Sequence, residues 1–141
     1  YKKSCKMIIG IGTDILDVRR ISKILNKYDQ SFVNRIYGSN EIKILENKSK
    51  CINLFLGKRF AAKEATWKAI SPNRGDGLVF KEIETLNDIN GKPYLYFSGV
   101  TKKYIKQREK SSKSKFNFNI SISDEPPYVI AFVIISLAHF V

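Results

Sequence analysis

The sequence predicts a single α+β domain with β-hairpins and clustered helices. Its 141 residues suffice for one hydrophobic core but not for two. Hydrophobic residues make up 43% of the chain and aromatic residues 12%, which is typical of a globular protein. Strand-like segments are joined by turns, and helix-like segments cluster between them, without the regular alternation of a parallel βαβ sheet.

A polar tail and an apolar strand begin the chain. Residues 1–6 lack an initiator Met and a signal peptide, and we expect a trimmed or recombinant tail. Residues 7–15 are apolar, and Gly10 and Gly12 within them allow a bulge or a close backbone approach. Asp14 ends this strand and either caps the next segment or binds a metal. Its position alone favours capping.

Three helical segments are predicted next. Residues 17–28 carry an apolar stripe at helical spacing, residues 32–37 form a short helix, and residues 41–50 continue as a helix into a polar loop. Arg19 and Arg20 lie at the start of the first helix, where the helix dipole disfavours cations. Cations at such a position can serve a partner, but a solvated helix face is the commoner explanation.

A fourth helix, residues 53–70, carries the central motif of the chain. Glu64 and Lys68 are four residues apart and fall on one helix face, one turn after Phe60. Taken alone, this spacing favours a surface ion pair of small energetic value. The other interpretation is a metal-binding carboxylate beside a phosphate-binding lysine.

The second half alternates between strands and turns. The loop and hairpin follow from Pro, Gly and Asn-Gly signals, and the strands follow from alternating apolar residues. The expected segments are a loop at 71–77, a strand at 80–86, a hairpin turn at 87–93, a strand at 94–97, a basic helix at 98–108, a mobile polar loop at 109–115, a strand at 116–123 and a buried strand at 128–141.

The net charge of +12 indicates an anionic partner: a nucleic acid, a phosphorylated ligand, an acidic protein or a membrane surface. Cys5 and Cys51 lack metal-type spacing, which favours a reducing compartment. The apolar segment 128–141 is too short to span a bilayer, and His139 within it is expected to be structural.

A basic nucleic-acid-binding module without catalysis is the alternative function. Lysine-rich loops and aromatic strands are compatible with a base-stacking platform. The aromatic residues alternate with isoleucine as core residues do, and no RNP, KH or zinc motif is present. The aromatic residues concerned are Tyr94, Tyr96, Phe97, Phe116 and Phe118.

Four segments, in register from residue 7 to about residue 135, carry a family resemblance. They are Gly10–Ile15, Arg59–Ala69, Asn90–Pro93 and Ser121–Glu125. Together they resemble holo-acyl-carrier-protein synthase, the small trimeric branch of the 4′-phosphopantetheinyl transferases. The resemblance implies a small antiparallel sheet packed against helices, with one domain per protomer over residues 7–141. It also implies a homotrimer with sites between protomers.

The implied reaction transfers 4′-phosphopantetheine from coenzyme A to a serine of apo acyl carrier protein, for fatty acid biosynthesis. The products are holo acyl carrier protein and adenosine 3′,5′-bisphosphate. Attack on a pyrophosphate phosphorus needs charge neutralisation, which Mg²⁺ supplies when carboxylates hold it. The resemblance assigns Asp14 and Glu64 as the metal ligands and Lys68 as the cation on the pyrophosphate, all three catalytic. Glu64 is either the general base or, as we prefer, the residue that positions a metal-bound water.

Further roles follow from the same resemblance. Arg59 is expected to bind a coenzyme A phosphate together with Lys68, and Gly91, Lys92 and Pro93 are expected near the adenine. A carrier-protein surface is assigned to Arg19, Arg20 and Arg35, because acyl carrier proteins are acidic. Some family members carry a histidine at the position of Asp124. Any role that this imidazole has in those proteins is absent from this chain.

Neither a nucleic acid nor a membrane is then expected as a partner. We expect an intracellular, soluble protein. The abundance of Ile, Lys and Asn, and the lysine-rich segments 47–50 and 109–115, fit a bacterium or a parasite with a relict plastid. The compartment would be the cytoplasm in the first case and the plastid (apicoplast) stroma in the second.

Overall fold

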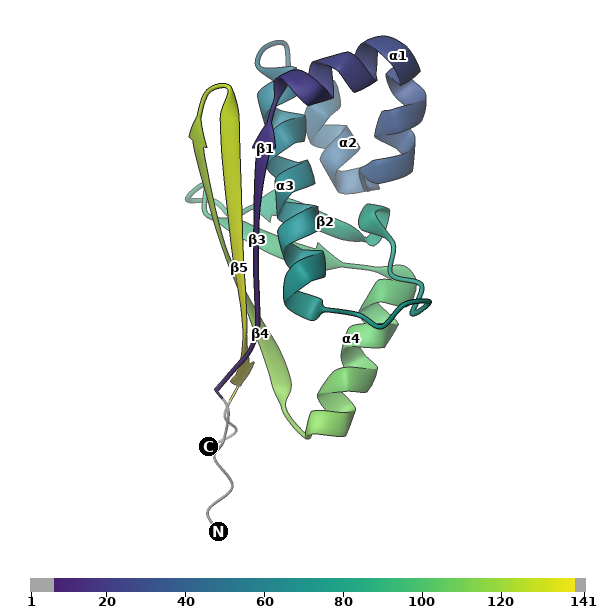
Figure 1. The fold of residues 1–141 in the computed structure, drawn as a ribbon, viewed down its shortest axis with the longest axis vertical. Helices are drawn as coiled ribbons and strands as arrows, with labels where there is room; N and C mark the ends of the chain where they lie inside the picture. The colour runs from purple at the N-terminus through teal and green to yellow at the C-terminus, as the bar shows by residue number, and fades with distance from the viewer. Residues whose placement is uncertain (1–6, 139–141) are drawn as a thin grey trace.

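A computed structural model describes residues 7–138 of the protein, so the expected tail at 1–6 and His139 lie outside the described residues. Within these residues, five strands and four α-helices follow one another (Figure 1). Their bounds are β1 Ile8–Asp17, α1 Arg19–Ile36, α2 Ser39–Glu46, α3 Ile52–Ile70, a 3₁₀ turn Phe80–Glu82, β2 Ile83–Asn87, β3 Pro93–Phe97, α4 Gly99–Ser112, β4 Lys115–Glu125 and β5 Tyr128–Ala138.

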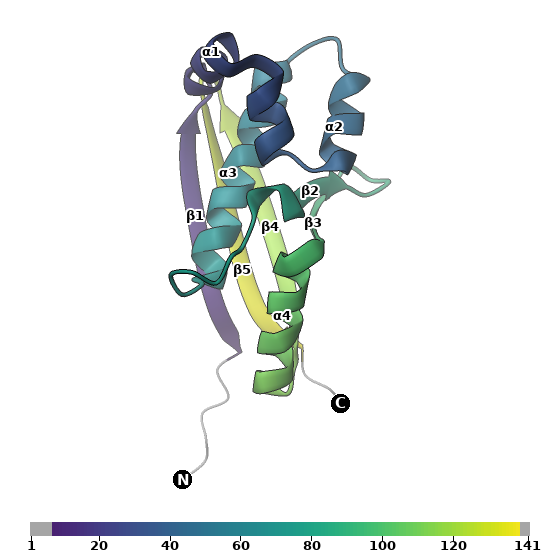
Figure 2. The ribbon, with the colours of Figure 1, turned by 90° about the vertical axis from the view of Figure 1, so that its right-hand side faces the viewer.

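The strands form two antiparallel sheets. The larger sheet has the order β1-β5-β4, and β2 and β3 form a separate two-stranded hairpin. The helices lie on one side of the larger sheet, and α3 runs along β1, β5 and β4 (Figures 1 and 2). The predicted α+β class, with a small antiparallel sheet packed against helices, is confirmed.

Helix α3 contacts the sheet through glycine and alanine. A Cβ atom added to Gly12 would lie 1.8 Å from the carbonyl oxygen of Ala65, and one added to Gly10 would lie 2.1 Å from that of Ala69. Only glycine can occupy either position without moving a backbone. The pairing of β1 with β5 also shifts register between Ile8 and Gly10. Both features expected of the two glycines, a bulge and a close approach, are therefore present.

The strand expected to be buried, β5, is buried on one face only. Val129, Ala131 and Val133 point into the core, whereas Ile130 and Phe132 remain 43% and 37% exposed. The prediction was wrong because an unbroken apolar run does not show whether something covers the second face. Ile15 pairs with Ile130 on the same outer face and is 63% exposed.

Two helix boundaries differ from expectation. The segments 17–28 and 32–37 form one helix, α1, interrupted at Asp29, which has φ 47° and ψ −134°. The mobile loop expected at 109–115 is instead the last turn of α4 and the start of β4. Glu109 accepts a hydrogen bond of 2.9 Å from the Phe116 backbone N–H, so this acidic side chain joins the helix to the strand. Polar composition had suggested a loop, but Lys, Glu and Gln also favour helix.

Two glutamates in the segment predicted as strand 80–86 act as helix caps. Glu84 is 2% exposed and accepts hydrogen bonds from the backbone N–H groups of Asn40 and Glu41 in the first turn of α2. Glu82, in the 3₁₀ turn, accepts one from Thr101 in the first turn of α4. Carboxylates at helix N-termini satisfy free N–H donors and interact favourably with the helix dipole. Within residues 7–138 no helix is both long and apolar enough to cross a membrane.

Replacing Gly12 with alanine tests the contact between β1 and α3. We expect the free energy of unfolding to fall by about 1–3 kcal/mol, because the added methyl group overpacks the contact with Ala65. Urea denaturation followed by circular dichroism measures the change. Ser111→Ala, at an exposed position of α4 away from this contact, is the control, with an expected change within about 0.5 kcal/mol. Equal stability of the two variants would contradict the tight contact.

Candidate active site

The structure brings Asp14, Glu64 and Lys68 together. Asp14 pairs with Ala131 in the sheet and therefore belongs to the face that α3 covers. The Lys68 Nζ atom lies 3.2 Å from Asp14 Oδ1 and donates a 2.9 Å hydrogen bond to the Thr13 carbonyl oxygen. The ion partner of Lys68 is thus a residue more than fifty positions away in the sequence.

Glu64 is half-buried beside this pair. Burial, and next the negative charge of Asp14, raise the pKa of the Glu64 carboxyl, while Lys68 and Arg20 lower it. Two carboxylates from different elements therefore repel each other across the contact between β1 and α3. Arg20 is close enough for its charge to reach the same group.

This donor set fits a hard divalent cation. Carboxylate oxygens are the ligands that Mg²⁺ prefers, and one or two of them suffice when substrate phosphates and water complete the shell. The described part of the chain contains no cluster of three or more His, Cys, Asp or Glu residues. Asp14 and Glu64 could hold a cation that also binds substrate oxygens, and a cation there would relieve their repulsion.

A second region is a pocket of about 480 Å³ where α3 meets the β2–β3 hairpin. We call it the phosphate pocket after the role expected of Arg59. It is lined by Arg59, Gly91 and Pro93, three of the residues expected to bind coenzyme A, and by Lys48 and Lys58. Lys92 instead lines an adjacent cavity of about 340 Å³, together with Pro93. Three positive side chains in one pocket form a site suited to a polyanion such as a phosphate-bearing nucleotide.

Arg59 is the most constrained of these cations. It is 6% exposed, and its guanidinium carbon lies 3.7 Å from the centre of the Phe55 ring. One guanidinium nitrogen donates a 3.1 Å hydrogen bond to the Asn87 side-chain oxygen. Burial lowers the pKa of Arg59, and Glu41 opposes this shift. Stacking and a single hydrogen bond therefore fix a buried cation at the wall of the pocket.

The three arginines predicted to meet a carrier protein occupy different positions. Arg19 forms hydrogen bonds with Asp17, the shortest of 2.6 Å, and these bonds hold the pKa of Asp17 below its usual range. Arg20 is exposed near Glu64, and Arg35 is exposed in the last turn of α1, beyond the break at Asp29. Arg20 therefore lies close to Glu64, whereas Arg19 is paired with Asp17.

Sequence reasoning missed two ion pairs. Lys58 Nζ lies 2.8 Å from Asp124 Oδ1, so Asp124 acts as a partner for a lysine of the phosphate pocket. Glu41 and Lys63 form a fully buried pair behind the same pocket. The only sequence signal for the second pair is a lysine among the alanines of the helix face that the core buries. Its partner is twenty-two positions away and could not be identified from local spacing.

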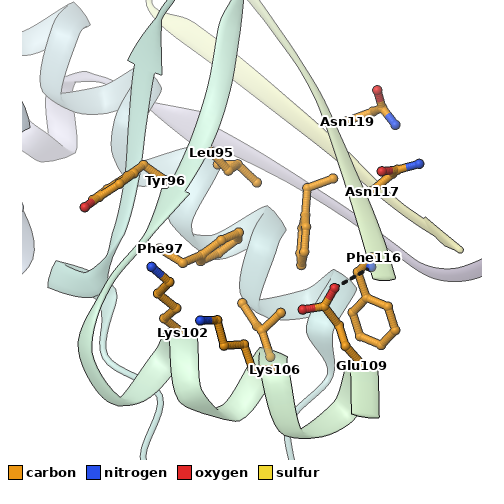
Figure 3. Close-up of a pocket in the computed structure, with 11 residues that line it drawn as sticks. Leu95, Tyr96, Phe97, Lys102, Lys106, Glu109, Phe116, Asn117 and Asn119 are labelled. Carbon is orange, nitrogen blue, oxygen red and sulfur yellow. Dashed lines mark hydrogen bonds between the residues drawn. The ribbon is translucent and has the colours of Figure 1, made fainter. Parts of the chain in front are cut away.

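Another cavity, of about 560 Å³, lies between β3, α4 and β4 (Figure 3). Phe97 and Phe118 approach each other there with ring centres 4.7 Å apart, and both pack against the hydrophobic core. The outward side chains of β4 include Asn117 and Asn119 rather than aromatic residues. Three of the aromatic residues that had suggested a base-stacking platform, Phe97, Phe116 and Phe118, therefore pack inward, and Tyr94 and Tyr96 lie exposed on the hairpin instead.

A comparison with models of known protein families identifies the class of protein. The family model of the 4′-phosphopantetheinyl transferase superfamily matches residues 10–133, which include both carboxylates and most of the phosphate pocket. Fold and site together thus define a phosphopantetheinyl transferase.

Individual relatives narrow the assignment. A holo-acyl-carrier-protein synthase from Orientia tsutsugamushi (strain Boryong) is 41% identical over 131 residues, covering 92% of this chain and 98% of the relative. The crystal structure of the Neisseria meningitidis synthase aligns with a TM-score of 0.79 at 35% identity, over 92% of this chain and 99% of that one. The Bacillus anthracis synthase in complex with CoA (3′,5′-ADP) aligns with a TM-score of 0.73 at 32% identity, over 94% and 99%. This chain belongs to the holo-acyl-carrier-protein synthase family.

Proposed function

We propose that this protein transfers 4′-phosphopantetheine from coenzyme A to a serine of apo acyl carrier protein, for fatty acid biosynthesis. The observation that carries the proposal is the meeting of Asp14, Glu64 and Lys68 near a cationic pocket. The relative crystallised with CoA has the same fold, which supports coenzyme A as the donor. The reaction gives holo carrier protein and adenosine 3′,5′-bisphosphate.

Each residue of the site has a role in this proposal. Asp14 and Glu64 would hold Mg²⁺, which supplies charge neutralisation on the pyrophosphate when bound. Lys68 adds a positive charge beside the same phosphates, and Arg59 holds the nucleotide end in the phosphate pocket, with Gly91 and Pro93 near the adenine. Glu64 orients the water that takes the proton of the attacking serine hydroxyl.

A mass measurement tests the reaction. An apo acyl carrier protein incubated with coenzyme A, Mg²⁺ and the protein should gain the mass of one phosphopantetheine. Asp14→Ala should abolish this gain while leaving the melting temperature nearly unchanged, because Asp14 lies at the edge of the core. Near-normal turnover by the variant would show that Asp14 is not a ligand, and no gain with the wild type would overturn the proposed reaction.

We further propose that the start of α1 receives the acidic carrier protein. Arg20 is exposed and close enough to Glu64 to affect its pKa, so a carrier bound there would bring its serine near the carboxylates. Arg19, which is paired with Asp17, lies next to Arg20, and Arg35 adds a positive charge in the last turn of the same helix. Complementary charge at such a surface raises the association rate and sets the choice of partner.

Arg20→Glu tests this surface. We expect the KM for the carrier protein to rise about tenfold or more, because a repulsive charge replaces an attractive one, while coenzyme A affinity stays close to that of the wild type. Steady-state kinetics and calorimetry measure the two quantities. Lys110→Glu, on the distant helix α4, makes the same charge change and should have little effect on either. An equal loss of both affinities in Arg20→Glu would refute the separate roles.

We also propose that the protein forms a homotrimer through the outer face of the larger sheet, with sites between protomers. Ile15, Ile130 and Phe132 are exposed together on this face, and Ile11 beside them is 58% exposed. Soluble monomers rarely expose apolar patches of this kind without a partner. A second and third copy would cover the face of β5 that the single chain leaves open.

Ile130→Asp tests the assembly. We expect a trimer mass for the wild type and a monomer mass for the variant in light scattering coupled to size-exclusion chromatography, since a charge cannot be buried without a partner. Transfer should fall with the loss of assembly. Ile89→Asp, at a fully exposed position of the hairpin turn, is the matched control and should remain trimeric. A wild-type monomer would contradict the proposal.

The compartment follows from the substrates. We propose that the protein works where its carrier protein is found, in the cytoplasm of a bacterium or in the plastid stroma of a plastid-bearing parasite. The Ile-, Lys- and Asn-rich composition supports both sources.

A further inference from the structure

Behind the phosphate pocket lies a buried ion pair that the reaction does not directly use. The side chains of Glu41 and Lys63 are both 0% exposed. The Lys63 ammonium donates three hydrogen bonds: one of 2.5 Å to Glu41 Oε1, one of 3.0 Å to the Phe80 carbonyl and one of 2.5 Å to the Ile83 carbonyl. All donors of the lysine are therefore satisfied within the protein.

The stability of the fold does not by itself explain why a charge pair is buried here. Taking two charges out of water is costly, and well-packed apolar residues of similar volume often stabilise a fold as well or better. Burial raises the pKa of Glu41 and lowers that of Lys63, while their mutual attraction opposes both shifts. A buried charge pair kept beside a ligand pocket is more readily explained by an electrostatic role in that pocket.

Glu41 has a second cation within reach. Its Oε1 atom accepts the Lys63 bond and a 3.1 Å bond from the Gly38 N–H, and its Oε2 atom accepts a 3.2 Å bond from the Thr85 N–H. The Nε atom of Arg59 lies 4.0 Å from Oε2 and, although buried, has no hydrogen-bond partner. Arg59 is thus attracted by Glu41 but does not form a hydrogen-bonded ion pair with it.

We propose that Lys63 neutralises Glu41 and thereby leaves the charge of Arg59 available to a phosphate of the donor substrate. Lys63 is then a positioning residue for coenzyme A that acts through Arg59, an inference that rests on the proposed function. Without the ammonium, Arg59 is the nearest remaining cation for Glu41. A small movement of its guanidinium would close the 4.0 Å gap and withdraw it from the pocket.

The two partners should therefore have opposite effects. Lys63→Met keeps the volume and removes the charge, so Glu41 captures Arg59 and the dissociation constant for coenzyme A should rise about tenfold, equivalent to about 1.4 kcal/mol. Glu41→Gln removes the competing anion and should leave coenzyme A binding at least as tight as in the wild type. The double variant lacks both charges and should return to within about threefold of the wild type.

Calorimetric titration with coenzyme A measures these constants, and thermal melting verifies that each variant is folded. In Lys63→Met the KM for the carrier protein should not change. General damage to the fold would instead raise both this KM and the dissociation constant for coenzyme A. Arg59→Ala combined with Lys63→Met should be no weaker than Arg59→Ala alone, because both changes act through one guanidinium.

The inference would be overturned if the variant carrying both Glu41→Gln and Lys63→Met bound coenzyme A as weakly as Lys63→Met alone. Weaker coenzyme A binding by Glu41→Gln than by the wild type would overturn it as well. Should Lys63→Met not fold, Glu41→Gln and the double variant still decide the question, since each carries its own expected sign. A wild-type protein that neither binds coenzyme A nor modifies a carrier protein would refute the proposed function instead, so the two failures are distinguishable.

Discussion

The close contact between β1 and α3 is the constraint on which the site depends. Gly10 and Gly12 bring the strand so near the helix that the carbonyl oxygens of Ala65 and Ala69 occupy the space where side chains would lie. This contact allows Asp14, two residues after Gly12, to reach the helix turn that carries Glu64 and Lys68. A larger residue at position 10 or 12 would push β1 away from α3 and thereby separate Asp14 from Glu64.

The second region of the site depends on acidic side chains that join distant elements. Glu84 lies on the hairpin but caps α2, and its approach requires Gly38, where an added Cβ would lie 2.3 Å from the carboxylate carbon. Glu41, in the capped turn, then reaches Lys63 of α3. The hairpin, α2 and α3 are thereby fixed around the phosphate pocket, and the position of Arg59 follows from contacts with all three elements.

Local sequence patterns predicted the helices and turns that depend on residues close together in the chain. An Ala- and Lys-rich composition located α3, the Asn-Gly turn and alternating residues located the hairpin, and the two glycines indicated the close approach that is observed. Side-chain partners distant in sequence could not be predicted. By alternation alone, Glu82 and Glu84 fall on the polar side of a strand, yet both cap helices that lie elsewhere in the chain. The site carboxylates were found through resemblance, because the spacing of Glu64 and Lys68 alone favoured a surface pair.

The positions of the acidic residues also explain why positive charge is available at the surface of this chain, whose net charge is +12. Glu41, Glu82 and Glu84 bind backbone N–H groups or a buried lysine, whereas Asp124 pairs with Lys58, a cation of the phosphate pocket. Carboxylates used inside the fold do not screen the cations outside it. The exposed Arg20 and Lys48 are therefore left to attract anions, which are the chemical class of both coenzyme A and an acidic carrier protein.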